Sequence, residues 1–147
     1  MQAQKGAIPL SSIKMTKKLL STYRKTKSEI PLLESELAYM QQEDHGFGNS
    51  VILDYRTGEP RAQAVVGFDW ARYDKRQQDL QAKKARCQAV ESWIEAIEDV
   101  QTRTVFRMHY LDGLTWGTIA AKIGYANSPD YPRLMIRDRY LKKMKIA

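Results

Sequence analysis

The last third of the chain most constrains what it can fold into, because short apolar patterns of helical spacing alternate there with glycines. Residues 100–111 form the first pattern, which Gly113 ends, and residues 115–123 form the second, which Gly124 ends. Glycine takes up at little cost the left-handed conformation that terminates helices. A third pattern, residues 130–144, mixes apolar and basic side chains. Each helix has an apolar face to bury, so we expect the three to pack together.

The boundaries of these helices follow from side chains that satisfy free backbone amides. Thr115 is expected to cap the second helix through its hydroxyl. Asp130 is expected to cap the third with its carboxylate, because Pro132 then falls in the first turn, where a missing N–H costs nothing. Core positions are predicted at Trp116, Ile119 and Tyr140. The segment therefore predicts a helix-turn-helix whose last helix exposes a basic side.

The N-terminal part carries a longer amphipathic pattern, expected to follow a cap at Ser11 or Ser12. Its seam keeps a four-then-three spacing at Leu19, Tyr23, Thr26, Ile30, Leu33, Leu37 and Met40. Such a seam packs on another helix. Either a second helix of the same chain or a second copy can cover it, so a homodimer through the N-terminal helices stays open. Pro31 interrupts the seam and predicts a kink or a new helix starting near Ser28.

Residues 43–68 separate this helix from the next, and their glycines predict a long loop. Residues 50–53 have the composition of a short strand, for which the sequence offers no convincing partner. A long helix is expected to start at Asp69 as its N-cap. Its apolar positions, spaced by seven, are Tyr73, Leu80, Cys87 and Ile94, with polar residues between them. This half-polar seam predicts the return arm of a helical hairpin.

The predicted fold class is therefore all-α, a coiled-coil-like N-terminal helical hairpin followed by a C-terminal three-helix bundle. Residues 1–10 are expected to be a disordered tail. Residues 11–99 form the predicted hairpin with its loop at 43–68, and residues 100–147 the predicted helix-turn-helix DNA-binding domain.

The net charge of +7 is unevenly distributed along the chain. Residues 1–42 carry +4, residues 43–100 carry −3, and residues 101–147 carry +6. A basic end beside an acidic middle is typical of a protein that binds nucleic acid at one end, since phosphate contacts supply most of the sequence-independent affinity.

Other function classes find little support in the residues. The single cysteine and the two histidines lie in unrelated segments, without metal-ligand spacing or a catalytic motif. We therefore expect no enzyme, no cofactor and no metal. No segment has the roughly 20 apolar residues that cross a bilayer, and no secretory signal is visible, which predicts a cytoplasmic protein without membrane contact.

A helix-turn-helix assigns roles by position, because the start of its last helix enters the major groove while neighbouring residues hold the backbone. Base-reading residues are predicted at Tyr131, Arg133, Met135 and Arg137. An arginine can pair with a guanine edge, and an apolar side chain can touch a thymine methyl. Phosphate contacts are predicted at Thr115, Lys122, Arg139, Lys142 and Lys143.

The order of residue types in this segment resembles region four of bacterial sigma factors. The resemblance is carried by Arg103, Phe106, Tyr110, Gly113, Ile119, Ala120, Gly124, Ile136, Tyr140 and Leu141. Thr118 stands where the family usually has an acidic residue, and the turn from Gly124 to Pro129 is longer than usual. With its N-terminal helices, the chain resembles the ArpU/RinA-type late transcriptional regulators of phages and prophages. The resemblance implies a sequence-specific double-stranded DNA-binding regulator of late genes, acting in the bacterial host cell. It also implies that the long helix breaks near residues 98–99, because sigma-like sequences begin a fresh helix just before the position of Arg103.

Two other functions stay open. One alternative is a small terminase-like or other packaging DNA-binding subunit, in which the N-terminal helices would build a ring. It is also compatible with a sigma-like module that engages RNA polymerase without reading DNA. Fold alone does not separate these functions, because function depends on the site.

Overall fold

The computed structural model describes residues 12–46, 52–54, 61–63 and 68–147, with side chains for residues 12–42 and 68–147. Its helices are α1 (Lys17–Ser21), α2 (Tyr23–Gly46), α3 (Trp70–Glu95), α4 (Val100–Phe106), α5 (Trp116–Lys122) and α6 (Arg139–Lys143). Two π-helical segments, η2 (Arg107–Leu111) and η3 (Pro132–Asp138), continue α4 and precede α6. The predicted all-α fold class is confirmed. The predicted disordered tail, residues 1–10, lies outside the described residues.

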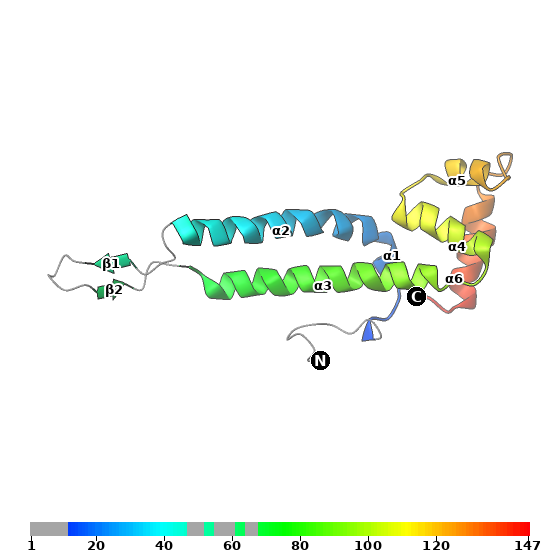
Figure 1. Ribbon diagram of the computed structural model, residues 1–147. Coiled ribbons are helices and arrows are strands. Elements are labelled where there is room, and N and C mark those ends of the chain that lie inside the picture. Colours follow the sequence, from blue (N-terminus) through cyan, green and yellow to red (C-terminus); the bar gives the residue numbers. More distant parts are fainter. Residues whose placement is uncertain (1–11, 47–51, 55–60, 64–67) are drawn as a thin grey trace.

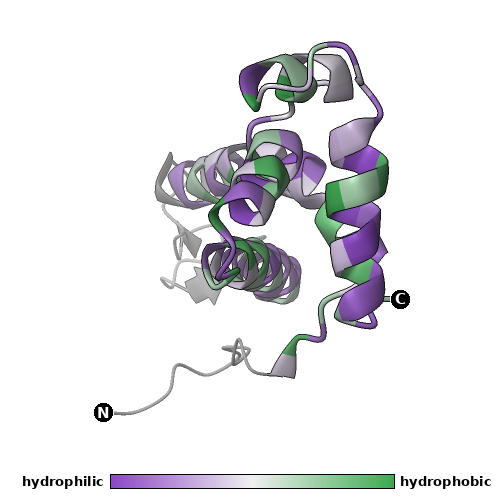
Figure 2. Cartoon of the chain, turned by 90° about the vertical axis from the view of Figure 1, so that its right-hand side faces the viewer, coloured by the Kyte–Doolittle hydropathy of each residue, from purple (hydrophilic) through white to green (hydrophobic). Residues whose placement is uncertain are grey.

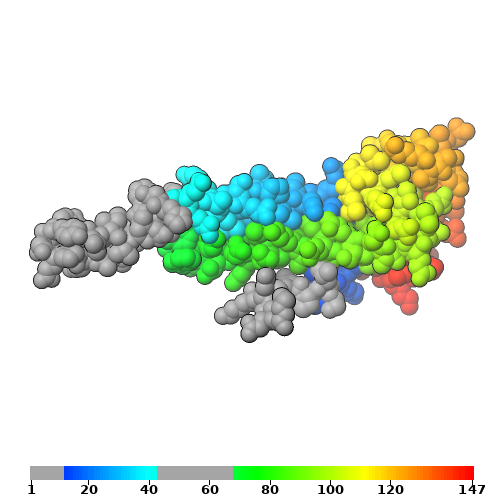
Figure 3. Space-filling model, in the orientation of Figure 1, coloured from blue at the N-terminus to red at the C-terminus, as the bar shows by residue number. Residues whose placement is uncertain are grey.

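The two long helices, α2 and α3, lie side by side as an extended hairpin, and the shorter helices gather at one of its ends (Figure 1). Between the arms, Leu37, Met40 and Leu80 are buried, with Leu33 and Tyr73 packed against them. The space-filling view shows the same elongated body, with the C-terminal residues at its broader end (Figure 3). The apolar positions spaced by seven in residues 73–94 therefore face the hairpin, as predicted for a return arm.

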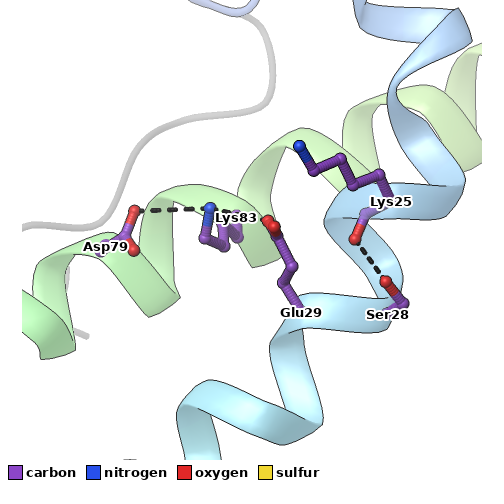
Figure 4. Close-up of polar contacts among 5 residues, drawn as sticks. All are labelled: Lys25, Ser28, Glu29, Asp79 and Lys83. Atoms are coloured by element: carbon purple, nitrogen blue, oxygen red, sulfur yellow. Dashed lines mark hydrogen bonds and ion pairs between the residues drawn. The ribbon is translucent and has the colours of Figure 1, made fainter.

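Ion pairs between the two arms account for the polar half of the seam. The pairs are Lys27–Glu91 at 3.0 Å, Lys83–Glu29 at 3.1 Å, Lys84–Glu34 at 3.0 Å and Arg76–Glu36 at 2.9 Å. Lys83 also lies 3.7 Å from Asp79 on its own helix, so its ammonium group sits between two carboxylates (Figure 4). Partly exposed pairs of this kind contribute about 0–1 kcal/mol each, so they select the pairing of the arms more than they stabilise it.

The structure corrects the expected start of the first helix and excludes one of the two alternatives predicted at Pro31, a new helix. α1 begins at Lys17 and not after Ser11 or Ser12, because Thr16 caps it by accepting the Leu19 N–H at 3.0 Å. α2 begins at Tyr23 and runs through Pro31, so no new helix starts near Ser28. Proline inside a helix costs about 3 kcal/mol. Burial of the apolar seam on both sides of Pro31 outweighs this cost, since each buried side chain contributes about 1.5–3 kcal/mol.

The predicted loop at 43–68 is shorter than expected and contains paired strands. α2 extends to Gly46, and β1 (Ile52–Asp54) pairs antiparallel with β2 (Arg61–Gln63). In this register Ile52 faces Gln63 and Asp54 faces Arg61. The expectation that the first strand has no partner is therefore wrong. The strand pair lies at the end of the hairpin away from the C-terminal helices (Figure 1).

One core joins the root of the hairpin to the C-terminal helices. It combines α1 and α2 residues such as Leu20 and Tyr23, α3 residues such as Val90 and Ile94, and Phe106 of α4. Phe106 is fully buried, and its ring lies 5.6 Å from Trp93 and 5.4 Å from Tyr140, centroid to centroid. Shared packing thus fixes the hairpin and the C-terminal helices to each other. The last C-terminal helix, η3 with α6, therefore has a definite position relative to the hairpin.

Candidate nucleic-acid interface

The first C-terminal helix, α4 with η2, begins where the sequence predicts a break. Asp99 accepts the Thr102 backbone N–H at 2.9 Å and the Thr102 hydroxyl at 2.8 Å, and the backbone bond is the main cause of a lowered Asp99 pKa. The helix ends at Gly113, whose φ is +73°. A Cβ atom placed on Gly113 would overlap the guanidinium of Arg24, so this side chain of α2 approaches the turn directly.

The second helix, α5, begins after the predicted cap, Thr115, and ends at the predicted glycine, Gly124. The Thr115 hydroxyl oxygen accepts the Thr118 N–H at 3.3 Å, which confirms the expected N-cap. At the other end Gly124 has φ +91°, and the Tyr125 N–H donates to the Ala120 carbonyl at 2.7 Å. This bond closes the helix as a Schellman motif.

The turn between the second and third helices is held by two stacked tyrosines. The rings of Tyr125 and Tyr131 lie 4.0 Å apart and nearly parallel, at 10°. A side-chain hydrogen bond to Tyr125, which favours the protonated Tyr131 phenol, raises the Tyr131 pKa. The Ser128 N–H donates to the Tyr125 carbonyl at 2.8 Å, and the Tyr131 N–H to the Ser128 carbonyl at 2.9 Å. The long turn is thus an ordered connection that sets where the third helix starts.

The start of the third helix, η3 with α6, differs from the prediction in one contact. Pro132 lies in the first turn, as expected, and is buried. Asp130, however, does not cap the helix with its carboxylate, because that group pairs with the Arg133 guanidinium at 3.2 Å. The expected bond to the backbone amides is therefore wrong. An ion-pair partner three residues away competes with the amides for the same oxygens.

The third helix divides into an inner and an outer side. Pro132, Ile136 and Leu141 are buried and face the core. Leu134 and Met135 are both 45% exposed, and Arg139 and Lys142 are exposed as well. Figure 2 shows this helix, which leads to the C-terminus, beside the ends of the two long arms. Its outer side thus offers apolar and basic groups together, the mixture that reads base edges and holds phosphates.

Arg137 differs from the other predicted base-reading residues because it is engaged inside the protein. Its Nε donates to Asp138 Oδ1 at 2.8 Å, and its guanidinium carbon lies 4.9 Å from the centre of the Trp116 ring. The Arg137 side chain is 22% exposed. Trp116 also stacks on His109 at 3.9 Å. Arg137 therefore links the third helix to the first and second helices.

A groove runs along one flank of the third helix, against the start of α4. It has a volume of about 810 Å³ and brings together Tyr131, Met135, Arg139 and Lys143 with Glu98 and Asp99 across from them. Two predicted base-reading residues and two predicted phosphate contacts thus share one flank. Arg133 and Arg137 do not line this groove.

The predicted phosphate contacts lie at the surface. Thr115, Lys122, Arg139, Lys142 and Lys143 are all exposed. The Thr115 hydroxyl oxygen accepts the cap hydrogen bond, and it also shares a hydrogen bond with the Thr118 hydroxyl at 3.0 Å. Among residues 12–42 and 68–147, no group of three or more His, Cys, Asp or Glu side chains could hold a metal ion. No helix in the described part of the chain is long and apolar enough to cross a membrane.

Sequence reasoning missed several residues around this interface. Leu134 belongs to the outer side, and no α-helical spacing could have placed it there, because it lies in the π segment η3. Lys17 and Lys18 of α1 also lie beside the third helix, near Arg137. No local pattern connects these lysines to a helix more than a hundred residues away.

Comparison with protein-family models, with curated proteins and with solved structures found no match to this chain.

Proposed function

We propose that this protein is a sequence-specific double-stranded DNA-binding transcriptional regulator of phage or prophage origin that acts on late genes in the bacterial cytoplasm. In this proposal α5 and the third helix work as a helix-turn-helix, and the hairpin pairs with a second copy. The observation that carries the proposal is the outer side of the third helix, where Leu134, Met135, Arg139 and Lys142 are exposed while the inner side is held by the core.

The contacts refine the roles of the predicted base-reading residues. Arg133 is held by one exposed pair with Asp130, which contributes about 0–1 kcal/mol. A bidentate pair between arginine and guanine discriminates against other bases by about 1–3 kcal/mol. Arg133 can therefore leave Asp130 and bind a guanine instead. Arg137 would have to leave both Asp138 and Trp116, and we assign it a positioning role. Met135 is free to contact thymine methyls, and Tyr131 is held at the entry of the helix by Tyr125.

Selection of bound sequences from random duplexes, followed by titration of single-base variants, tests the proposal. Arg133→Ala and Met135→Ala are expected to relax the preference at one or two base positions by about 1–3 kcal/mol each. Lys142→Ala should weaken binding to all duplexes alike and lower the salt slope by about 1. Lys75→Ala, an exposed lysine of α3, is the matched control.

One outcome would reject DNA reading. If wild-type protein shows no salt-dependent binding to any duplex, the phosphate contacts do not exist, because their counterion release must produce a steep slope. The exposed Leu134 and Met135 would then favour the second candidate, a module that engages RNA polymerase through these apolar side chains. Binding of purified polymerase that Leu134→Ala and Met135→Ala abolish would support that candidate.

A further inference from the structure

α1 is fixed against the third helix although the two are distant in sequence. Leu20 of α1 is 1% exposed and lies in the same core cluster as Leu141 of the third helix. The Lys17 backbone N–H donates to the Ala147 carbonyl at 2.7 Å, which ties the start of α1 to the last residue. Blue atoms of the first described residues accordingly lie near red C-terminal atoms in Figure 3. The position of α1 relative to the third helix is therefore set by packing.

The lysines of α1 stand at the edge of this junction. Lys17 and Lys18 are exposed and line a hollow of about 290 Å³ together with Arg137, Asp138 and Leu141 of the third helix. Within the hollow, Asp138 is already paired with Arg137 at 2.8 Å. The two lysines thus add positive charge beside the third helix from a different part of the chain.

This hollow and the 810 Å³ groove lie on different flanks of the third helix. The helix contributes Arg137, Asp138 and Leu141 to the hollow and none of these to the groove, which Arg139 and Lys143 line. Within α6, Leu141 is two residues from both Arg139 and Lys143, which is about 200° around the helix at about 100° per residue, so the hollow and the groove face roughly opposite sides. The exposed strip between them carries Leu134 and Lys142. Cationic groups therefore border this strip on both sides.

Such a border fits duplex DNA. A helix that enters the major groove, which is about 12 Å wide, has a phosphate backbone on each side. Phosphate contacts on both backbones fix how the helix lies in the groove. We propose that Lys17 and Lys18 contact the phosphate backbone opposite the one held by Arg139 and Lys143. This inference rests on the proposed function, and it makes the N-terminal helix part of the DNA-binding surface.

The test is the salt dependence of binding to a fluorescein-labelled duplex of random sequence, measured by anisotropy. Lys17→Ala/Lys18→Ala should lower the slope of log affinity against log salt by about 1.8, which is about 0.9 for each phosphate that is no longer neutralised. The ratio of wild-type to variant affinity should then shrink about twelvefold between about 50 and 200 mM salt. Lys17→Arg/Lys18→Arg keeps the charge and should keep the slope.

Two controls keep the outcomes distinct. Arg72→Ala/Lys75→Ala removes the same charge from exposed residues near the start of α3, where no DNA contact is proposed, and should leave the slope unchanged. Both lysines of α1 are exposed, so unfolding curves of Lys17→Ala/Lys18→Ala should match those of wild type.

A wild-type slope in Lys17→Ala/Lys18→Ala, alongside a reduced slope in Arg139→Ala/Lys143→Ala, would overturn this inference and leave the proposed function standing. An equal reduction of the slope in the Arg72/Lys75 control would also overturn it, because net charge alone would explain the effect. Absence of salt-dependent binding by the wild-type protein would overturn both proposals together.

Discussion

His109, Trp116 and Arg137 join the three C-terminal helices through one stack of side chains. The His109 ring lies on Trp116 at an interplanar angle of 20°, and its Nδ1 is 3.3 Å from the Leu114 carbonyl oxygen. The Arg137 guanidinium approaches the same indole. A cation over an aromatic ring contributes about 0.5–1 kcal/mol at an exposed site and more when it is desolvated. The orientation of the third helix thus depends on an imidazole in the first.

The protonation of His109 should affect stability. Burial is the main cause of a lowered His109 pKa, and Arg137 adds to it against the opposing Leu114 hydrogen bond. Arg137 and Asp138, with Lys17 and Lys18 of α1, are the charged groups that share its hollow. Because the folded state prefers the neutral ring, the stabilisation is complete above the ordinary pKa of 6.5 and is lost as pH falls below it.

Urea unfolding at about pH 7.5, 6.5 and 5.5 measures this effect. The chain has two histidines, so a His45→Asn background leaves His109 as the remaining imidazole. We expect the free energy of unfolding to fall across this range in that background, and His109→Phe to flatten the change. A pH dependence that His109→Phe leaves intact would mean that other groups cause it.

At the scale of elements, the glycines of the C-terminal helices offer a graded comparison. Gly113 and Gly124 have positive φ, whereas Gly117 lies inside α5. A Cβ on Gly113 would meet the Arg24 guanidinium, while one on Gly124 or Gly117 would meet nothing within 4 Å. Gly124→Ala therefore isolates backbone strain, and Gly113→Ala adds displacement of Arg24.

We expect Gly124→Ala to destabilise the fold by about 1–2 kcal/mol, the cost of a left-handed conformation in a residue with a Cβ. Gly113→Ala should destabilise it by more than Gly124→Ala. Gly117→Ala should stabilise it by up to about 1 kcal/mol, since alanine is the better helix former. Thermal and urea unfolding rank the three variants. Equal effects at all three positions would contradict the helix ends as described.

The ends of helices could be predicted where a single residue determines them through its own backbone or a contact within one turn. Asp69 and Thr115 cap the helices that follow them, and Gly124 ends α5, because each acts within one turn of backbone. The predicted cap at Asp130 was wrong because the neighbouring Arg133 guanidinium binds its carboxylate. The Tyr125–Tyr131 stack also had no periodic signal, since it spans an irregular turn.

The π-helical segments could not be predicted, because the sequence patterns were interpreted with the α-helical period of about 3.6 residues per turn. In η3 hydrogen bonds run to the fifth residue, so the side chains do not follow the α-helical spacing. Ile136 and Leu141, five residues apart, are both buried, in two different core clusters. The base-reading register could not be derived for the same reason, because the π segment changes which residues reach the outer side.

For the whole molecule, the sequence predicted two long arms and three short helices but not the core that they share. Met15, Leu20 and Leu141 lie in one cluster, and nothing local in the N-terminal residues indicates a partner at the other end of the chain. The hairpin arms were predictable because their seam repeats over many turns. Only the structure shows that α1 lies beside the third helix. The same placement brings Lys17 and Lys18 next to that helix.

The proposed homodimer is a prediction for the whole molecule. Leu32 is 70% exposed and Tyr39 is 61% exposed on α2, and both line a groove of about 770 Å³ that also reaches Asp79 and Lys83 of α3. Exposed apolar side chains spaced by seven on one helix are typical of a face that pairs with another helix. We expect light scattering to give the mass of two chains.

Leu32→Gln/Tyr39→Gln should give the mass of one chain with unchanged helical content. Val100→Gln, which removes a 64% exposed apolar side chain elsewhere, should leave two chains together. A closed ring of many copies in the wild-type protein would instead favour the packaging subunit over the dimeric regulator.

The length of the hairpin determines how far its distal end lies from the C-terminal helices. α3 has 26 residues and, at about 1.5 Å per residue, spans about 39 Å. One turn of duplex DNA rises about 34–36 Å. With the third helix bound in the proposed manner, the arm is long enough to carry β1 and β2 about one duplex turn from the point of contact. The hairpin is then a spacer, about as long as one duplex turn, between the proposed DNA contact and the strand pair.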